Sequence, residues 1–313
     1  MPDILIIAPL PPFLADPLRA GYHCHDYYQA SDKPGLLKEE GGSIRGLVQG
    51  GGTVTPTSLL DQLPKLEIIS VFGVGYDGVP VDYCRARHIR VAHTPDVLTD
   101  DVADVAVALT LMTCRGFARL ERFLRKGEWE KRGPDLTTRL RGKHVGILGL
   151  GRIGKAIAER LRAFGAEISY TGRKPQKVPY KYVDSLKALA KQSDFLIVAC
   201  PGGPATQHLV NAEIIAALGN KGTLINIARG SIVDEAALVS ALSEGKLGGA
   251  GLDVFADEPH VPAALLEMDN VVLLPHVGSA TRETRQAMGD LCKANLDAWF
   301  KERKVLTLIP ELS

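Results

Sequence analysis

The stretch VGILGLGRIGKAIAERL, residues 145–161, constrains the fold of this chain more than any other. An apolar run leads into Gly149, Gly151 and Gly154, and an amphipathic helical pattern follows. In such a unit the first glycine permits a tight turn, the second lets backbone approach a pyrophosphate, and the third lets the helix pack on the strand. Free amides and the positive dipole at the helix N-terminus favour an anion. The context predicts a dinucleotide site, and the alternative is a tight turn without a ligand.

Short apolar runs alternate with helical patterns along the chain, which predicts parallel sheets covered on both faces. The fold class is therefore α/β: a Rossmann domain, with a doubly wound parallel sheet, and a smaller second α/β unit. A length of 313 residues is sufficient for two domains. Six strands are expected in the larger domain, at residues 145–148, 167–170, 195–200, 223–227, 249–254 and 271–274. Four are expected in the smaller one, at residues 3–9, 44–50, 66–75 and 89–95.

Two long helices separate and rejoin these domains. Residues 94–112 carry Pro95, a capping candidate at Thr99 and then apolar residues on nearly every face, which predicts a helix buried by a domain or by another subunit. A second helix is expected over residues 281–300, returning the chain to the first unit. The smaller domain is thus expected to be discontinuous, at residues 1–97 and 282–313, with the larger domain at residues 98–281.

Composition excludes several other classes of protein. The formal net charge of +1 gives no reason to expect nucleic acid or an anionic membrane as a partner. The five cysteines have no CxxC or Cys/His spacing, so neither a disulfide framework nor a zinc site is indicated and no metal is expected. The N-terminal sequence does not resemble a signal peptide, and no run of about 20 apolar residues occurs. We expect the protein in the cytoplasm.

The stretch ISYTGRKPQ, residues 168–176, indicates which dinucleotide binds. In NAD-binding members of this fold, an acid at the end of the second strand binds the ribose 2′-hydroxyl. Here that place is Gly172, followed by Arg173 and Lys174. Two cations without an acid suit a 2′-phosphate, so the stretch predicts an NADP site. The alternative is two solvated cations on a surface loop.

Polar residues follow three later strands, where an open α/β sheet binds its ligands. TLINIARG ends near Arg229, AGLDVFADEP carries Asp253 and Glu258, and NVVLLPHVGSAT contains His276. Singly, the arginine, glutamate and histidine could be a surface cation, a turn acid and a histidine bonded to backbone. Together they form an acid, its orienting carboxylate and a cation for an anionic substrate.

At these motifs the sequence resembles the D-2-hydroxyacid dehydrogenases, and within them reductases that use NADPH on glyoxylate, hydroxypyruvate or hydroxyphenylpyruvate. The resemblance covers nearly the whole chain, most clearly VFGVGYDGV, TPDVLTDDVADVA, GLGRIG, INIARG, GAGLDVFADEP and LLPHVGSAT. It implies that Arg229, Glu258 and His276 are the catalytic trio, and that the protein is a homodimer built on the helix after Thr99. It also implies that the smaller unit is a flavodoxin-like α/β substrate-binding domain, interrupted by the NADP-binding Rossmann cofactor domain. We expect cofactor contacts at Gly149, Leu150, Gly151, Arg152, Ile153, Gly154, Gly172, Arg173, Lys174, Cys200, Pro201, Thr206, Ile227, Ala228, Asp253, His276 and Gly278.

The chemistry of 2-oxo acid reduction requires these residue types. A hydride adds to the carbonyl carbon, and the developing oxyanion takes a proton from His276, oriented by Glu258. Arg229 can bind the substrate's carbonyl and carboxylate oxygens. FGVGYDG, residues 72–78, offers the amides of Val74 and Gly75 as a nest for that carboxylate, although a plain strand-to-helix turn is the alternative. Residues 49–55 and residues of a second subunit are further candidates for the pocket wall.

The sequence thus predicts an NADPH-dependent oxidoreductase of the 2-oxo acid reductase type. Small polar substrates, glyoxylate and hydroxypyruvate, with glycolate and D-glycerate as products, are favoured over 4-hydroxyphenylpyruvate and other arylpyruvates, because the latter need an additional apolar pocket. A different class remains: a redox sensor that binds NADP(H) and a protein partner without turnover. The complete trio argues against that class.

Overall fold

The computed structural model describes all residues, 1–313, and the chain divides into two compact units. The smaller unit contains residues 1–98 and 281–313, and the larger contains residues 99–280. The sequence-based boundaries, after residues 97 and 281, each differ from this division by one residue. Both units are α/β, as predicted. No helix has the length and apolar character needed to span a bilayer.

The larger unit is built on a seven-stranded sheet in which every pair of neighbours is parallel. Its order is β12-β11-β10-β9-β6-β7-β8. The strands are β6 (His144–Leu148), β7 (Glu167–Thr171), β8 (Lys181–Tyr182), β9 (Phe195–Val198), β10 (Thr223–Asn226), β11 (Gly249–Leu252) and β12 (Val271–Leu273). All six expected strands are present, but β8 was missed because it has only two residues and no apolar run.

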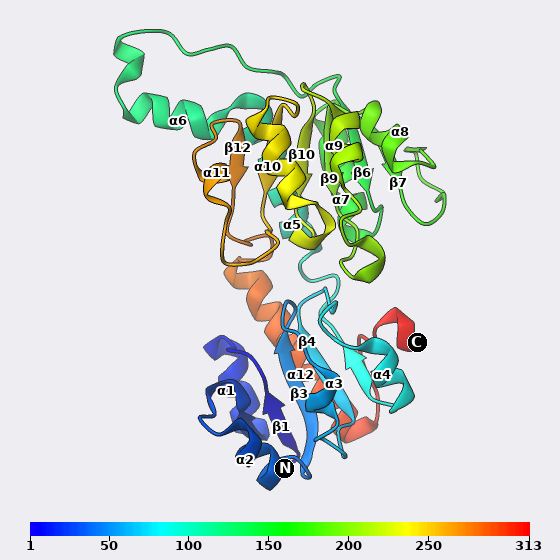
Figure 1. Ribbon diagram of the computed structural model, residues 1–313. Helices are drawn as coiled ribbons and strands as arrows, with labels where there is room; N and C mark the ends of the chain where they lie inside the picture. Colours follow the sequence, from blue (N-terminus) through cyan, green and yellow to red (C-terminus); the bar gives the residue numbers. More distant parts are fainter. The chain divides into compact units, whose positions relative to one another are not determined.

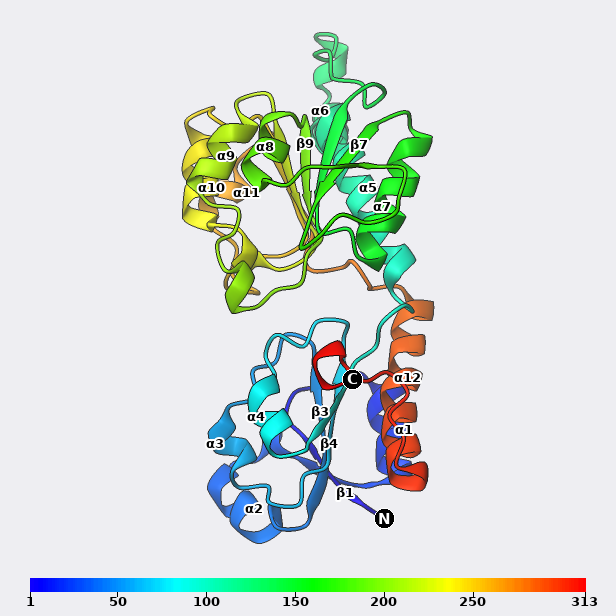
Figure 2. The same cartoon turned by 90° about the vertical axis from the view of Figure 1, so that its right-hand side faces the viewer.

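Helices cover both faces of this sheet, as continuous apolar strands require. In Figure 2, one face carries α5 and α7 and the other carries α8 to α11. Their bounds are α5 (Thr99–Arg115), α7 (Arg152–Ala163), α8 (Leu186–Lys191), α9 (Ala212–Leu218), α10 (Glu235–Ser243) and α11 (Ala263–Leu266). Leu196, Val198 and Leu224 of the strands are fully buried in a core with the helices of the second face.

The long helix α5 is buried largely within its own unit. It packs on α7 and on β10, β11 and β12, and Arg160 of α7 pairs with Asp100 and Asp104 at 2.8 and 2.6 Å. The helix begins at Thr99 itself, which was expected as the cap before it, and runs three residues beyond the expected end at Met112. Four apolar residues on one side remain partly or fully exposed: Val105, Ala108, Leu111 and Met112.

A projecting arm follows α5 and comprises residues 117–140. It consists of α6 (Phe117–Arg125), a short 3₁₀ turn (Glu128–Glu130) and an extended segment. In Figure 1 this arm reaches away from the sheet of the larger unit. Several of its large apolar side chains are exposed: Phe117, Leu124, Trp129 and Leu136.

The smaller unit has a parallel five-stranded sheet in the order β2-β1-β3-β4-β5, which is the flavodoxin-like order. Its strands are β1 (Asp3–Ile6), β2 (His23–Asp26), β3 (Ile44–Gly50), β4 (Ile68–Phe72) and β5 (Arg90–Ala92). Four strands were expected. The additional edge strand β2 reads HCHD, and this polar sequence gave no strand signal.

Helices also cover both faces of the smaller sheet. Figure 2 shows α1 (Pro12–Gly21) beside α12 (Arg282–Glu302) on one face, with α2 (Lys33–Glu40), α3 (Thr57–Leu60) and α4 (Val81–Ala86) on the other. The expected return helix is α12, whose first turn is capped by the Thr281 hydroxyl accepting from the Thr284 amide at 3.2 Å. This helix packs on β4 and α1, so the smaller unit is discontinuous in sequence.

Candidate active site

The glycine-rich turn follows β6, an interior strand of the larger sheet. Gly149 has a φ of 96°, and a Cβ there would lie 2.7 Å from both the Cα and the amide nitrogen of Cys200. At Gly154 a Cβ would lie 2.2 Å from the carbonyl oxygen of Gly149, so this glycine permits close packing of helix on turn. Gly151 caps α7 and faces open space. The turn therefore leaves room for a phosphate group at the helix N-terminus.

The end of β7 carries an open, positively charged loop. No heavy atom lies within 4 Å of a Cβ built on Gly172, and Arg173 and Lys174 are exposed without ion-pair partners. The next residues tie this loop to the glycine-rich turn, because Gln176 Nε2 donates to the Leu150 carbonyl at 2.8 Å. The Gln176 amide also donates to Tyr170 Oη at 2.7 Å. No acid occupies the position that would repel a 2′-phosphate.

The remaining expected cofactor residues also lie in this unit. Arg152 and Ile153 begin α7, whereas Ile227 and Ala228 follow β10. Cys200 and Pro201 follow β9, which ends two residues earlier than predicted. Burial raises the pKa of Cys200 to about 11, so its thiol stays protonated at neutral pH. The Thr206 hydroxyl donates to the Pro201 carbonyl at 2.9 Å and so closes the loop.

His276 and Glu258 are in direct contact. His276 follows β12, and its Nδ1 lies 2.7 Å from Glu258 Oε2. The other carboxylate oxygen of Glu258 accepts from the Phe255 amide at 3.1 Å, which fixes the glutamate. Both side chains remain partly exposed, at 44% for the histidine and 35% for the glutamate. The contact at Nδ1 leaves Nε2 of the ring as the nitrogen that can exchange a proton with a bound molecule.

Arg229 lies at the same sheet edge, on the turn after β10. The buried side chain of Asn226 braces this turn: its amide group donates to the Arg229 carbonyl at 2.9 Å and its oxygen accepts from the Ala228 amide at 3.1 Å. Arg229 donates from Nη1 to the Ala228 carbonyl at 2.7 Å. Its charge acts on Glu258, as the pKa of that glutamate shows.

The electrostatics of the pair keep Glu258 ionised. Burial by itself raises the pKa of Glu258, but hydrogen bonds from His276 and the Phe255 amide, with the nearby charges of His276 and Arg229, lower it below its ordinary value. A glutamate with a lowered pKa is a carboxylate throughout the neutral range. It can therefore fix the ring of His276 and stabilise its protonated form.

Asp253 supports the loop that carries His276. It is 1% exposed, and its two carboxylate oxygens accept from the amides of Val277 and Gly278 at 2.7 and 2.8 Å. Burial raises the pKa of Asp253 despite these two bonds. Asp253 lies just after β11, which ends two residues earlier than expected. In this structure its contacts hold the backbone on the C-terminal side of His276, which has a φ of 54°.

In the smaller unit, the turn after β4 presents two free amides. The amide nitrogens of Val74 and Gly75 donate to no acceptor in the chain, whereas the Val74 carbonyl oxygen lies 2.9 Å from His93 Nδ1. The neighbouring loop, residues 49–55, packs on this turn, since the Gly51 amide donates to the Phe72 carbonyl at 3.2 Å. Two adjacent free amides can bind a carboxylate.

Sequence reasoning missed the residues that brace this turn. Tyr76 donates from its hydroxyl to Glu311 Oε2 at 2.7 Å, and its ring meets His93 edge-on at 5.3 Å between centroids. The segment carrying Glu311 is anchored by buried Asn295, whose Oδ1 accepts from the amides of Leu306 and Thr307. Asn226 and Gln176 were missed in the same way. Only the neighbouring motifs in the sequence could have drawn attention to them.

Comparisons with known proteins agree on one family. Residues 107–278 match the family model described as "D-isomer specific 2-hydroxyacid dehydrogenase, NAD binding domain". The chain is 48% identical to hydroxyphenylpyruvate reductase of Plectranthus scutellarioides and 46% identical to glyoxylate/hydroxypyruvate reductase A of Arabidopsis thaliana. In each case the match covers 97% of both chains.

A solved structure extends these similarities to three dimensions. It is the NADPH-dependent glyoxylate/hydroxypyruvate reductase of Sinorhizobium meliloti, in complex with NADP and malonate. The TM-score is 0.91 at 44% identity, with 99% of this chain and 97% of that chain covered. Fold and site thus define an NAD(P)-dependent oxidoreductase with a doubly wound cofactor domain. The chain belongs to the D-2-hydroxyacid dehydrogenase family.

The glycine-rich turn yields a matched pair of predictions. Gly149→Ala should lower both the melting temperature and dinucleotide affinity, because its Cβ clashes with Cys200 backbone at a positive φ, at a cost of about 1 to 3 kcal/mol or more. Gly151→Ala should leave the melting temperature unchanged and weaken dinucleotide binding, because only the ligand's space is filled. Thermal unfolding and cofactor fluorescence titration measure the two effects. Equal melting temperatures for both variants would contradict this reading of the turn.

Proposed function

We propose that this protein catalyses the NADPH-dependent reduction of glyoxylate and hydroxypyruvate to glycolate and D-glycerate. The observation that carries the proposal is the 2.7 Å contact of His276 with ionised Glu258, close to the charge of Arg229, at the ligand-binding edge of a dinucleotide-binding sheet. The glyoxylate/hydroxypyruvate reductases of Arabidopsis thaliana and Sinorhizobium meliloti, similar over nearly their whole lengths, support this substrate class.

The chain's own groups have distinct roles in this reaction. NADPH, when bound, supplies the hydride that adds to the carbonyl carbon. His276 donates the proton from Nε2 to the carbonyl oxygen as negative charge develops there. Glu258 holds the ring through Nδ1 and stabilises the imidazolium before transfer. Arg229 stabilises developing charge on the oxygen, and the amides of Val74 and Gly75 bind the substrate carboxylate.

The residues of the larger unit fit NADPH better than NADH. Gly172 leaves open space, and the unpaired cations Arg173 and Lys174 can bind a 2′-phosphate. Gln176 holds their loop against Leu150 of the glycine-rich turn. The Sinorhizobium meliloti relative is NADPH-dependent. We therefore propose NADPH as the preferred cofactor.

Arg173→Ala should raise the Michaelis constant for NADPH and leave that for NADH nearly unchanged. A hydrogen bond to a charged group contributes roughly 1.5 to 3 kcal/mol, which is about ten- to a hundredfold in affinity. Initial rates with each cofactor measure the effect. Lys177→Ala, an exposed cation on the same loop, is the control and should change neither constant. Equal losses with both cofactors after Arg173→Ala would disprove the 2′-phosphate role.

His276→Ala should abolish most of the reduction while leaving NADPH binding near normal, with loss on the order of 10²- to 10⁴-fold for a missing proton donor. Exposed His260, changed to alanine, is the control. Glu258→Gln should retain only partial activity, because the neutral amide can still contact Nδ1 of His276 but offers the ring no ionised partner.

The ionisation of Glu258 determines how reduction depends on pH at the acid end of the profile. Because the pKa of Glu258 is lowered, its carboxylate keeps the contact with His276 throughout the pH range in which an ordinary glutamate titrates. The contact is lost only as the pH falls through the lowered pKa. Wild-type reduction should therefore not lose this contact near pH 5. A pH profile of kcat/KM for both proteins measures this. Identical profiles for wild type and Glu258→Gln would exclude the proposed role.

A second substrate class has a specific observation in its favour. The relative from Plectranthus scutellarioides, 48% identical over 97% of both chains, is a hydroxyphenylpyruvate reductase. Specificity constants for glyoxylate, hydroxypyruvate, pyruvate, phenylpyruvate and 4-hydroxyphenylpyruvate with saturating NADPH decide between the classes. We expect the two small polar acids to lead. An arylpyruvate ahead by more than about tenfold, or 1.4 kcal/mol in transition-state binding, would replace the proposed substrate but not the reaction class.

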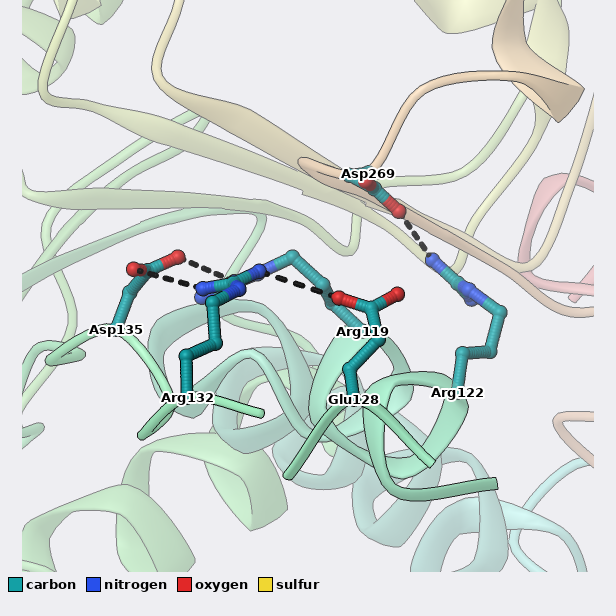
Figure 3. Close-up of polar contacts among 6 residues, drawn as sticks. All are labelled: Arg119, Arg122, Glu128, Arg132, Asp135 and Asp269. Carbon is teal, nitrogen blue, oxygen red and sulfur yellow. Dashed lines mark hydrogen bonds and ion pairs between the residues drawn. The ribbon is translucent and has the colours of Figure 1, made fainter. Parts of the chain in front are cut away.

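We also propose a homodimer that uses α5 and the arm. Figure 3 shows how the arm is fixed: Arg122 pairs with Asp269 at 2.7 Å, while Arg119 and Arg132 reach Asp135 at 2.9 and 3.6 Å. Arg132 also pairs with Glu128 at 3.3 Å. An arm held in place while Trp129 and fully exposed Leu136 face solvent suits a surface that a second copy covers.

Trp129→Ser combined with Leu136→Ser should shift the protein from dimer to monomer, because the two most exposed apolar side chains of the arm are removed. Light scattering after size exclusion measures the mass. Leu266→Ser, at another exposed leucine of the same unit, should leave the dimer intact. A wild-type monomer, or a dimer that persists in the double variant, would exclude this surface.

All five cysteines are unpaired, in keeping with the cytoplasm as the location we propose.

A further inference from the structure

A cluster of two histidines and one aspartate lies in the smaller unit, among residues that the proposed reaction does not use. It is formed by Asp3 of β1 with His23 and His25 of the neighbouring strand β2. His23 Nδ1 lies 2.7 Å, and His25 Nε2 lies 3.0 Å, from the same oxygen of Asp3, Oδ1. One ligand atom from each residue can be chosen so that all three lie within 4.8 Å of one another.

The strand geometry brings these side chains together. In the parallel register, Asp3 is opposite His23, and residues two apart on a strand point to the same face, so His23 and His25 both face the aspartate. Their rings meet edge-on, with centroids 4.7 Å apart. The intervening Cys24 belongs to the other face of the strand. A His-x-His pair on one strand with a carboxylate on the next is thus set by the backbone.

The donor set suits a borderline divalent metal ion. Zinc binds imidazole nitrogen and carboxylate oxygen at about 2.0 to 2.2 Å, so two ligands of a tetrahedral ion lie about 3.3 Å apart. The two short contacts at Asp3 need to open by only a few tenths of an ångström.

Access differs among the three ligands in a way that suits binding. The His25 side chain is only 9% exposed and Asp3 is 21% exposed, so these two are held in place. His23 is 67% exposed, and β2 is the edge strand of its sheet, so an ion can enter from solvent and keep a water ligand. Neutral imidazoles can accept the ion by moving their protons to the opposite ring nitrogens.

We propose that Asp3, His23 and His25 form a binding site for a divalent transition metal ion, with zinc as the probe ion. The ion would link β1 to β2 and stabilise the smaller unit. Magnesium should not bind, because it prefers oxygen ligands and octahedral geometry. This site is independent of the proposed reductase activity, so neither proposal depends on the other.

The test is calorimetric titration of chelator-treated protein with zinc chloride. A His276→Ala background removes one further exposed histidine–carboxylate pair at which zinc could bind, that of His276 with Glu258. We expect one zinc ion per chain and a higher melting temperature with zinc. Since even indirect supports of a metal site change affinity about 10- to 100-fold, loss of a ligand should weaken binding by at least tenfold in His25→Ala and Asp3→Asn.

Two variants keep the test decisive. Exposed His23→Ala should fold normally and also weaken binding by at least tenfold, whatever the fate of His25→Ala. The matched control is His144→Ala, because His144 also lies beside a carboxylate, 3.3 Å from Glu167, but has no second histidine there. It should leave zinc binding unchanged. Absence of binding to the starting protein, or equal affinity in His23→Ala, would overturn the proposal.

Discussion

The parallel arrangement of the larger sheet is the constraint on which the candidate site depends. Because neighbouring strands run in the same direction, the ends of β6, β10, β11 and β12 meet at one edge. The glycine-rich turn, Arg229, Asp253 and His276 each follow one of these ends. Four segments far apart in sequence therefore supply one site, and the buried apolar strands fix its framework.

Within that framework, buried polar side chains determine the conformation of the loops. Asp253 accepts from two amides after His276, and Asn226 closes the turn that carries Arg229. Both are about 1% exposed, so removing either would leave amides without partners where water cannot easily replace them. Asp253 was predicted to contact the cofactor. Its contacts in the structure identify a second way in which it supports the site, through the backbone beside His276.

The sequence is most informative where one strong signal determines the local structure. Gly149, Gly151 and Gly154 predicted the turn, and the apolar pattern after Thr99 predicted α5, because these signals act over a few residues. The polar edge strand β2 and the two-residue strand β8 lack such a signal. Contacts such as Tyr76 with Glu311 join residues far apart in the chain and depend on how the last segment packs. For the same reason the His23–His25 cluster was invisible: it requires the pairing of β2 with β1.

The bond from Gln176 to the Leu150 carbonyl joins two loops that are usually considered separately. We have proposed that one loop binds the 2′-phosphate of the cofactor, and the sequence predicts that the other binds its pyrophosphate. Replacing the loop after β7, which carries Arg173 and Lys174, would therefore also disturb the glycine-rich turn unless Gln176 were kept, because its bond to Leu150 would be lost. The two loops are thus connected through Gln176, and transplanting the pair together with this glutamine is the natural unit of exchange.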